Sequence, residues 1–272
     1  MNIYGLLYVM LVAFLAGALG ALIGIGGGSI FVPLLDILVE YEILKDVTFH
    51  EIVATSLVCT IVTANTSSLI YIKKKLTNIR IGLLLGLINV LGVATGASLM
   101  TSLPGNILKA LFGVFLIGAS IRILKKINEK EDAHGDPPDI DPLALKLELN
   151  GSYFDDAEKR EISYNVKNVL KGTLLSFFGG FLAGLLGIGG GVINVPIMII
   201  ILDLPPKVAA ATSLFIIGLN GATGGLIYLI SGLVNPYLVS SAMVGIFTVS
   251  YTHLRAHETE AISYAVFCLK KK

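Results

Sequence analysis

Long uncharged stretches dominate this chain. Asp, Glu, Lys and Arg are absent from five runs, residues 1–35, 52–72, 81–108, 172–202 and 208–254. About 20 apolar residues cross a bilayer as a helix, so each run is long enough to hold a membrane span. The buried helices of a large soluble core are the alternative, but such helices need polar outer faces, which these runs lack. The pattern predicts an all-α polytopic membrane protein.

The composition supports this prediction and removes several function classes. The 272 residues are 54% hydrophobic and 14% charged, whereas soluble domains carry about 25% charged residues. The net charge of +1 offers nucleic acid no basic surface. The two cysteines, Cys59 and Cys268, provide neither a disulfide framework nor a metal cluster. We therefore expect a lipid bilayer around the protein, and no nucleic-acid partner, metal or cofactor.

Two copies of a glycine-rich motif divide the chain into similar halves. Gly24–Pro33 reads GIGGGSIFVP and matches GIGGGVINVP at Gly187–Pro196, an offset of 187 − 24 = 163. Downstream, the sequence ATSL at Ala54–Leu57 recurs at Ala211–Leu214, an offset of 211 − 54 = 157. Ordered matches of this kind indicate an internal repeat. We expect two repeats of about four transmembrane helices each, with a glycine-broken first helix in each repeat.

The charged segments set the expected domain boundaries and orientation. Membrane repeat 1 is expected at 1–124, a polar insert at 125–171 and an incomplete membrane repeat 2 at 172–248. Basic residues after the second and fourth spans place those loops in the cytoplasm. With four spans per half, the N-terminus and the central insert are both predicted to be cytoplasmic, and the repeats to be parallel. A re-entrant hairpin at each glycine break would instead invert the halves.

The insert is predicted to hold a small β module. Leucines alternate with other residues over 143–149, and Asn150-Gly151 is typical of a hairpin turn. A second alternation over 162–166 predicts another strand. A disordered linker is the alternative for this segment.

The last residues, 249–272, resemble translated sequencing-adapter DNA. VSYTHLRAHET reads as an in-frame translation of a transposase adapter, and ISYAVFCLKKK as the flow-cell end of the same adapter. His253 and His257, with Glu258, could otherwise suggest a zinc site, but the adapter accounts for both histidines. We therefore expect a non-native tail and a second repeat that is cut short near Thr248.

The glycine motif is the candidate functional feature. Glycine weakens a helix by about 1 kcal/mol relative to alanine, so four glycines in five positions favour unwinding. Freed N–H groups at a half-helix start can bind an anion; close helix packing is the alternative, and it is the interpretation we give to Gly82, Gly86, Gly92 and Gly96. The predicted substrate-binding residues are Gly24, Gly26, Gly27, Gly28, Ser29, Thr55, Ser56, Asn65, Gly187, Gly189, Gly190, Gly191, Asn194, Thr212, Ser213 and Asn220.

Two copies of G-x-G-G-G-x-x-x-x-P, each followed by Ala-Thr-Ser-Leu, resemble the sulfite exporter TauE/SafE family. The resemblance implies a permease or exporter, in the cell membrane, of a small sulfur-containing anion such as sulfite or an organosulfonate. An enzyme is not expected, because the spans hold no acid, base or nucleophile set. A membrane scaffold or sensor that acts through the insert is the alternative function. The sequence leaves a homo-oligomer open.

Overall fold

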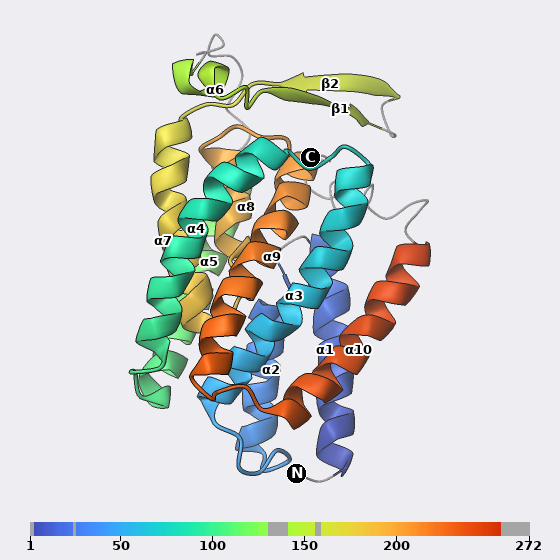
Figure 1. The fold of residues 1–272 in the computed structure, drawn as a ribbon, viewed down its shortest axis with the longest axis vertical. Helices are drawn as coiled ribbons and strands as arrows, with labels where there is room; N and C mark the ends of the chain where they lie inside the picture. The colour runs from blue at the N-terminus through green and yellow to red at the C-terminus, as the bar shows by residue number, and fades with distance from the viewer. Residues whose placement is uncertain (1–2, 24–25, 130–140, 156–158, 257–272) are drawn as a thin grey trace.

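The computed structural model describes residues 3–23, 26–129, 141–155 and 159–256, and within them the fold is a bundle of helices (Figure 1). This confirms the predicted all-α class. The helices are α1 Ile3–Ile23, α2 Gly28–Glu40, α3 Phe49–Lys73, α4 Ile79–Met100, α5 Gly105–Glu129, α6 Pro142–Lys146, α7 Val169–Leu186, α8 Gly191–Ile200, α9 Pro206–Ile230 and α10 Pro236–Ala256. The strands β1 Gly151–Asp155 and β2 Arg160–Tyr164 form one antiparallel pair.

Local sequence signals fix where the two central helices of the first half begin. The Thr48 hydroxyl accepts a hydrogen bond from the Glu51 backbone N–H, and the Glu51 carboxylate accepts one from the Thr48 N–H, so α3 starts with a capping box. The Asn78 side chain accepts a bond from the Ile81 N–H at 3.1 Å and caps α4. These caps place both helix starts at polar segments outside the uncharged runs.

Each glycine motif reverses the chain and produces a re-entrant hairpin. A Cβ on Gly5, at the start of α1, would lie 3.2 Å from the Ile43 carbonyl oxygen, just after α2. The Lys167 N–H, just before α7, donates to the Leu202 carbonyl oxygen just after α8, at 3.1 Å. Gly26 takes φ +83°, a conformation that L side chains rarely adopt. The expected single span through each break is therefore wrong: α1–α2 and α7–α8 each enter and leave at one end.

The two hairpins enter the bundle from opposite ends. Glu51 at the start of α3 accepts a hydrogen bond from Asn235 at the start of α10. At the other end, the Asn78 N–H before α4 donates to the Thr212 hydroxyl near the start of α9. Consequently α3 and α9 run antiparallel, and the halves have opposite directions (Figure 1). The predicted parallel arrangement is wrong, because the re-entrant hairpin makes no net crossing.

This arrangement also corrects the predicted orientation. The start of α1 lies beside the loop that follows α2, at the opposite end of the bundle from the insert (Figure 1). The N-terminal end of α1 and the insert therefore face opposite sides of a membrane. The prediction that both are cytoplasmic is wrong for one of them.

Small residues allow the helices to pack backbone against backbone. A Cβ on Gly92 or on Gly96 of α4 would collide with carbonyl oxygens of Phe177 or Phe181 in α7. In the same way, a Cβ on Gly245 of α10 would collide with the backbone of α1. Close approach of this kind is typical of membrane helices. The packing interpretation of Gly92 and Gly96 is confirmed.

The described residues of the insert are ordered, but the predicted position of its hairpin turn is wrong. Pro142 at the first turn and the Asp141 cap start α6, so part of the alternating leucine segment is helical. The hairpin joins Asp155 to Arg160, not Asn150 to Gly151. Asn150 instead accepts a hydrogen bond from the Val166 N–H at 2.8 Å. A prediction of β structure was therefore right for β1 and β2, while residues 130–140 lie outside the described residues.

Specific contacts dock the insert onto the ends of α4, α7 and α9. Lys207 at the start of α9 pairs with Asp155 of β1 at 2.8 Å, and their side chains are only 15% and 7% exposed. The Asn78 side chain donates to the Tyr164 hydroxyl at 3.0 Å. Burial raises the pKa of the Tyr164 phenol, and the bond from Asn78 lowers it by less. The phenol therefore remains protonated at neutral pH and holds β2 against the bundle.

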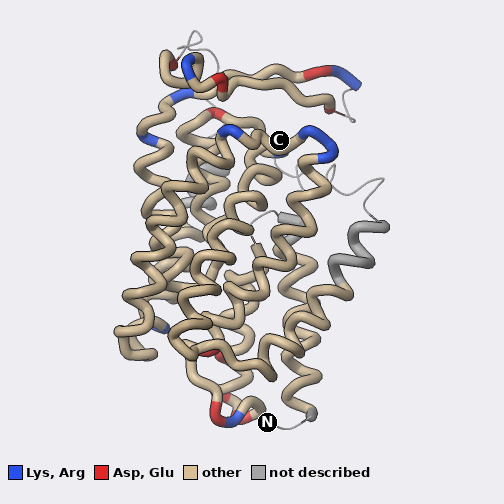
Figure 2. Tube along the Cα trace, viewed as in Figure 1, with Lys and Arg blue, Asp and Glu red and all other residues tan. Residues whose placement is uncertain are grey.

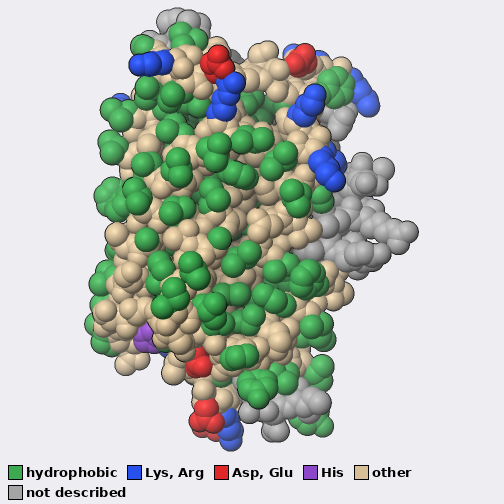
Figure 3. Space-filling model, viewed as in Figure 1, with side chains coloured by type: hydrophobic (Ala, Val, Ile, Leu, Met, Phe, Trp, Pro, Cys, Tyr) green, Lys and Arg blue, Asp and Glu red, His purple; other side chains and the backbone are tan. Residues whose placement is uncertain are grey.

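The outer surface fits a bilayer. Four described helices, α3, α4, α7 and α9, are long and apolar enough to cross a membrane. Among the described residues, Lys, Arg, Asp and Glu gather toward the two ends of the helix bundle (Figure 2). Between those ends, the face in Figure 3 is covered by hydrophobic side chains. The predicted tail is not tested: α10 extends to Ala256, and residues 257–272 lie outside the described residues.

Candidate functional site

The two glycine turns meet in the interior of the bundle. A Cβ on Gly28, at the start of α2, would lie 2.6 Å from the Gly187 carbonyl oxygen at the end of α7. Ser56 of α3 donates to that same carbonyl oxygen at 2.7 Å. On the other side of the first turn, a Cβ on Gly26 would lie 3.3 Å from Ile217 of α9. The motifs are 163 residues apart in the sequence, and folding places them in contact.

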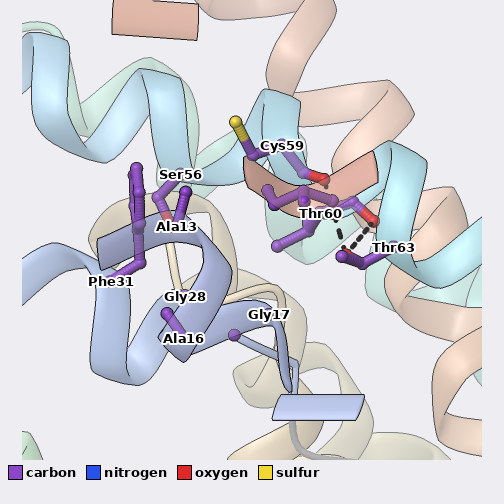
Figure 4. Close-up of a pocket in the computed structure, with 11 residues that line it drawn as sticks. Ala13, Ala16, Gly17, Gly28, Phe31, Ser56, Cys59, Thr60 and Thr63 are labelled. Atoms are coloured by element: carbon purple, nitrogen blue, oxygen red, sulfur yellow. Dashed lines mark hydrogen bonds between the residues drawn. The ribbon is translucent and has the colours of Figure 1, made fainter. Parts of the chain in front are cut away.

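A pocket opens at the start of α2 (Figure 4). The pocket is narrow: its cavity of about 10 Å³ holds roughly one water molecule, so a larger ligand requires the surrounding helices to move apart. The lining residues come from α1, the first glycine turn, α2, α3 and α10: Ala13, Ala16, Gly17, Gly27, Gly28, Phe31, Ser56, Cys59, Thr60, Thr63 and Ile246. The Gly27 carbonyl accepts bonds from Ile30 and Phe31, whereas the first N–H groups of a helix have no acceptor within it. The start of α2 can therefore donate to a ligand in this pocket.

Three hydroxyl-bearing side chains of α3 line this pocket, although the surface exposed to the pocket is almost entirely apolar. Ser56, Thr60 and Thr63 line it, and Ser67, one turn further along α3, lines an adjoining pocket with Gly26. Thr60 donates to the Leu57 carbonyl oxygen at 2.7 Å. Thr63 donates to the carbonyl oxygens of Thr60 and Cys59, at 3.2 and 3.4 Å (Figure 4). In this structure the three hydroxyl protons thus bond to backbone carbonyls. They can be redirected to an anion by rotation about the C–O bond.

A buried amide cluster surrounds the second glycine turn. Asn194 of α8 donates to the Asn89 side-chain oxygen at 3.0 Å. Asn220 of α9 donates to the Gly189 carbonyl oxygen at 2.9 Å and to the Asn89 oxygen at 3.3 Å. All three asparagines are fully buried. The Asn220 side-chain oxygen has no hydrogen-bond partner among the described residues. The cluster holds the second turn against α4 and α9.

The sequence prediction missed the centre of this cluster. Asn89 of α4 also donates to the Leu85 carbonyl oxygen and to the Ser176 hydroxyl of α7. A side-chain amide in an apolar run is costly without partners, and Asn89 lies inside the uncharged run 81–108. The free-energy cost of burying an amide in an apolar span was the signal that could have identified Asn89 from the sequence. Ser176 carried no comparable signal, because a serine can bond within its own helix.

Several predicted residues lie elsewhere. The Thr212 hydroxyl accepts from the Asn78 N–H and joins α9 to α4 near the insert, away from the two turns. Asn65 is exposed on α3, beside Gly218. Thr55 and Ser213 are buried, and their hydroxyl oxygens have no hydrogen-bond partner among the described residues.

The remaining predicted residues belong to the turns themselves. Ser29 and Gly191 lie in the first turns of α2 and α8, beside Gly27 and Gly190. Gly24 lies outside the described residues.

The described interior holds one free thiol, Cys59, but no buried charged side chain outside the insert and no cluster of metal ligands. Of the described charged side chains, Asp155 is the buried one, and it lies in the insert. No group of three His, Cys, Asp or Glu side chains is close enough to hold a metal ion in the described part of the chain. What the two turns do present is backbone N–H groups, hydroxyls and amides. These groups can bind and release a small polar solute.

Comparison with known proteins identifies the family. The family model described as "Sulfite exporter TauE/SafE" matches residues 9–257. The chain belongs to this family. Its members are membrane transporters, so this protein is a membrane transporter and not an enzyme. That result favours transport over the scaffold or sensor alternative.

Relatives of this TauE/SafE protein agree with that assignment. It is 35% identical to "Probable membrane transporter protein YunE" of Bacillus subtilis over 240 residues, 87% of this chain and 82% of the relative. It is 30% identical to "Probable membrane transporter protein MJ0441" of Methanocaldococcus jannaschii over 245 residues, 88% of this chain and 77% of the relative. "Sulfite exporter TauE/SafE family protein 6" of Arabidopsis thaliana is 39% identical over 62 residues, 23% of this chain and 14% of that protein. No solved structure matches the chain significantly.

Proposed function

We propose that this protein is a secondary transporter of a small anion, sulfite or another sulfur-containing anion such as an organosulfonate. The observation that carries the proposal is the meeting of two glycine turns from opposite ends of the bundle, beside a hydroxyl-lined pocket. Membership of the TauE/SafE family and the printed name of the Arabidopsis relative support a sulfur-containing anion.

The chemistry of the pocket favours a small oxyanion. The start of α2 supplies N–H groups that have no acceptor within the helix and the positive end of a helix dipole. Ser56, Thr60 and Thr63 supply hydroxyls that can rotate from their carbonyl partners toward an anion. Oxygen atoms of a sulfite or sulfonate group accept hydrogen bonds from both kinds of donor. No Lys or Arg lines either described pocket. The anion is therefore held by neutral donors, which permits rapid release.

We infer the orientation of this transporter from the distribution of its charged residues. Basic residues flank the insert end of the bundle: Lys73, Lys74, Lys75, Arg80, Lys167, Lys171 and Lys207. The opposite end carries Glu40, Glu42 and Asp46 around Lys45. An excess of Lys and Arg in loops marks the cytoplasmic side. The insert is accordingly cytoplasmic, and the first residues of α1 lie outside.

Substitution of the turn glycines tests the proposed function. Gly26→Leu and Gly189→Leu place a large side chain where a Cβ already meets Ile217 at 3.3 and 3.1 Å. We expect each variant to reduce flux of radiolabelled sulfite into proteoliposomes at least about 100-fold, because a 1 Å misplacement alone can cost that much. Insertion should be unchanged. Thiosulfate flux and the flux of taurine, a zwitterionic organosulfonate, are measured in parallel and identify the preferred substrate.

Gly118→Leu on α5 is the matched control, because a Cβ there has no atom within 4 Å. It should insert and transport like the unmodified protein. Normal flux in both Gly26→Leu and Gly189→Leu would contradict the proposed binding site. Absence of flux for sulfite, thiosulfate and taurine in the unmodified protein would contradict the proposed substrate class.

A further inference from the structure

A single hydroxyl group touches the pocket and both glycine turns. Ser56 lies in α3, 1% exposed, and lines the pocket at the start of α2. Its oxygen would be 2.8 Å from a Cβ on Gly28, in the first turn, and donates to the Gly187 carbonyl oxygen of the second turn at 2.7 Å. Figure 4 shows Ser56 above Gly28, at the edge of the pocket. The Ser56 side chain is therefore placed to contact both a ligand in the pocket and the backbone of the second hairpin.

The bond from Ser56 satisfies a helix end that its own helix cannot satisfy. Gly187 is the C-cap of α7, and the last carbonyl groups of a helix have no intrahelical donor. A Cβ on Gly187 would lie 2.7 Å from the Val53 carbonyl oxygen of α3, so the turn is seated directly on the α3 backbone. If the Ser56 hydroxyl rotated away from Gly187, the Gly187 and Ser56 oxygens would face each other at hydrogen-bonding distance without a proton between them. Two such oxygens repel.

We propose that Ser56 is a positioning residue that couples occupancy of the first-hairpin pocket to the position of the second glycine turn. This inference rests on the proposed function. A serine hydroxyl has one proton, which it donates either to Gly187 or to an anion in the pocket. When the Ser56 hydroxyl donates its hydrogen bond to an anion instead, the Gly187 carbonyl loses its donor and the turn moves away from α3. Binding at one hairpin thereby releases the other, which enters from the opposite end of the bundle.

The equivalent residue of the second half has no hydrogen-bond partner among the described residues. Ser213 corresponds to Ser56 at the offset of 213 − 56 = 157 that relates the two ATSL segments. Its hydroxyl oxygen is buried without a hydrogen-bond partner in the described structure. The acceptor that corresponds to Gly187 is Gly24, at the offset of 187 − 24 = 163 between the two glycine motifs, and it lies outside the described residues. Among the described residues, a bond from an ATSL serine to a glycine turn is made by Ser56.

Hydrogen–deuterium exchange of the turn can test the coupling. The full-length protein is reconstituted in lipid nanodiscs, and exchange of the peptide covering residues 185–191 is measured with and without sulfite, alongside binding of radiolabelled sulfite. Coupling between two sites typically amounts to about 5–150-fold, so we expect sulfite to raise exchange of this turn by about 5-fold or more. Ser56→Ala should show raised exchange without sulfite and less than about a twofold response to it.

Two further variants separate coupling from a structural role. Ser56→Cys keeps a weaker donor and should restore part of the sulfite response. Ser68→Ala removes the same group from a buried site on α3 that lines neither pocket, and it should respond like the unmodified protein. Elution of each variant as a single folded species on size exclusion establishes that the comparison is between folded proteins.

The outcomes distinguish this inference from the proposed function. Sulfite binding to the unmodified protein without a change in exchange of the turn would overturn the coupling and leave the proposed function intact. If sulfite raised exchange of the turn in Ser56→Ala as much as in the unmodified protein, the coupling would also be overturned and the proposed function left intact. If the unmodified protein binds none of sulfite, thiosulfate and taurine, the proposed function fails, and the coupling fails with it.

Discussion

At the scale of single residues, the second glycine turn depends on positions that accept no side chain. Gly190 takes φ +93°, and a Cβ there would lie 2.9 Å from the Asn220 side-chain nitrogen and 3.2 Å from that of Asn194. The backbone and the amide cluster therefore exclude a side chain for independent reasons. Glycine at this position is required by the turn and by its neighbours together.

Gly190→Ala is expected to destabilise the protein. An L residue in such a strained backbone region costs about 1–3 kcal/mol, and the displaced amides add to that cost. Gly113→Ala on α5 is the control, because a Cβ there meets nothing within 4 Å and alanine favours a helix by about 1 kcal/mol. Thermal unfolding in detergent, followed by circular dichroism at 222 nm, should show a lower midpoint for Gly190→Ala only. Equal midpoints for the two variants would contradict the account.

The scale of residues also shows where sequence reasoning succeeds. The glycine motif identifies the turns, because loss of helix propensity is a local property of four glycines in five positions. Thr212 shows the opposite case. Its hydroxyl has the same sequence context as Thr55, but its partner is the Asn78 N–H, 134 residues away in the sequence. No local pattern reveals such a partner.

At the scale of elements, the second hairpin is anchored to α4 in two ways. Glycines let the backbones of α4 and α7 touch, since a Cβ on Gly180 would collide with the Asn89 carbonyl oxygen. The Asn89 side chain then bonds to Ser176, Asn194 and Asn220, on α7, α8 and α9. One side chain of α4 therefore ties three other helices together in the interior.

Asn89→Ala is expected to loosen this hairpin. It leaves the buried amides of Asn194 and Asn220 without a shared partner, and each buried unsatisfied group costs about 1–3 kcal/mol. We expect a lower thermal midpoint by circular dichroism and reduced sulfite flux. Thr95→Val on the exposed face of α4 is the control, because its hydroxyl bonds within its own helix. An unchanged midpoint in Asn89→Ala would show that the cluster contributes little.

At the scale of the whole molecule, the re-entrant hairpins decide the topology. Each hairpin returns to its own side, so the described chain has α3, α4 and α5 as successive crossings before the insert (Figure 1). An odd number of crossings puts the start of α1 and the insert on opposite sides. The loop after α2 shares the side of the start of α1, because Gly5 contacts Ile43 and Leu44.

Cysteine labelling in intact cells checks this topology. Tyr41 after α2 is 76% exposed, and Leu145 in the insert is 55% exposed. Tyr41→Cys and Leu145→Cys are made separately in a chain whose Cys59 and Cys268 are replaced by serine. A membrane-impermeant maleimide should label position 41 in intact cells and position 145 only after permeabilisation. Labelling of both positions from the same side would refute the opposite orientation of the two loops.

The sequence by itself determined the membrane environment, the two glycine breaks and an interior without charge. These properties follow from composition and from local helix propensity, which do not depend on distant partners. The tertiary structure decided that each break reverses the chain, and hence that the halves run in opposite directions. It also decided that Asn89 joins four helices and that Ser56 reaches Gly187, 131 residues away. A glycine motif permits a bend, but the packing of the flanking helices determines where the chain goes next.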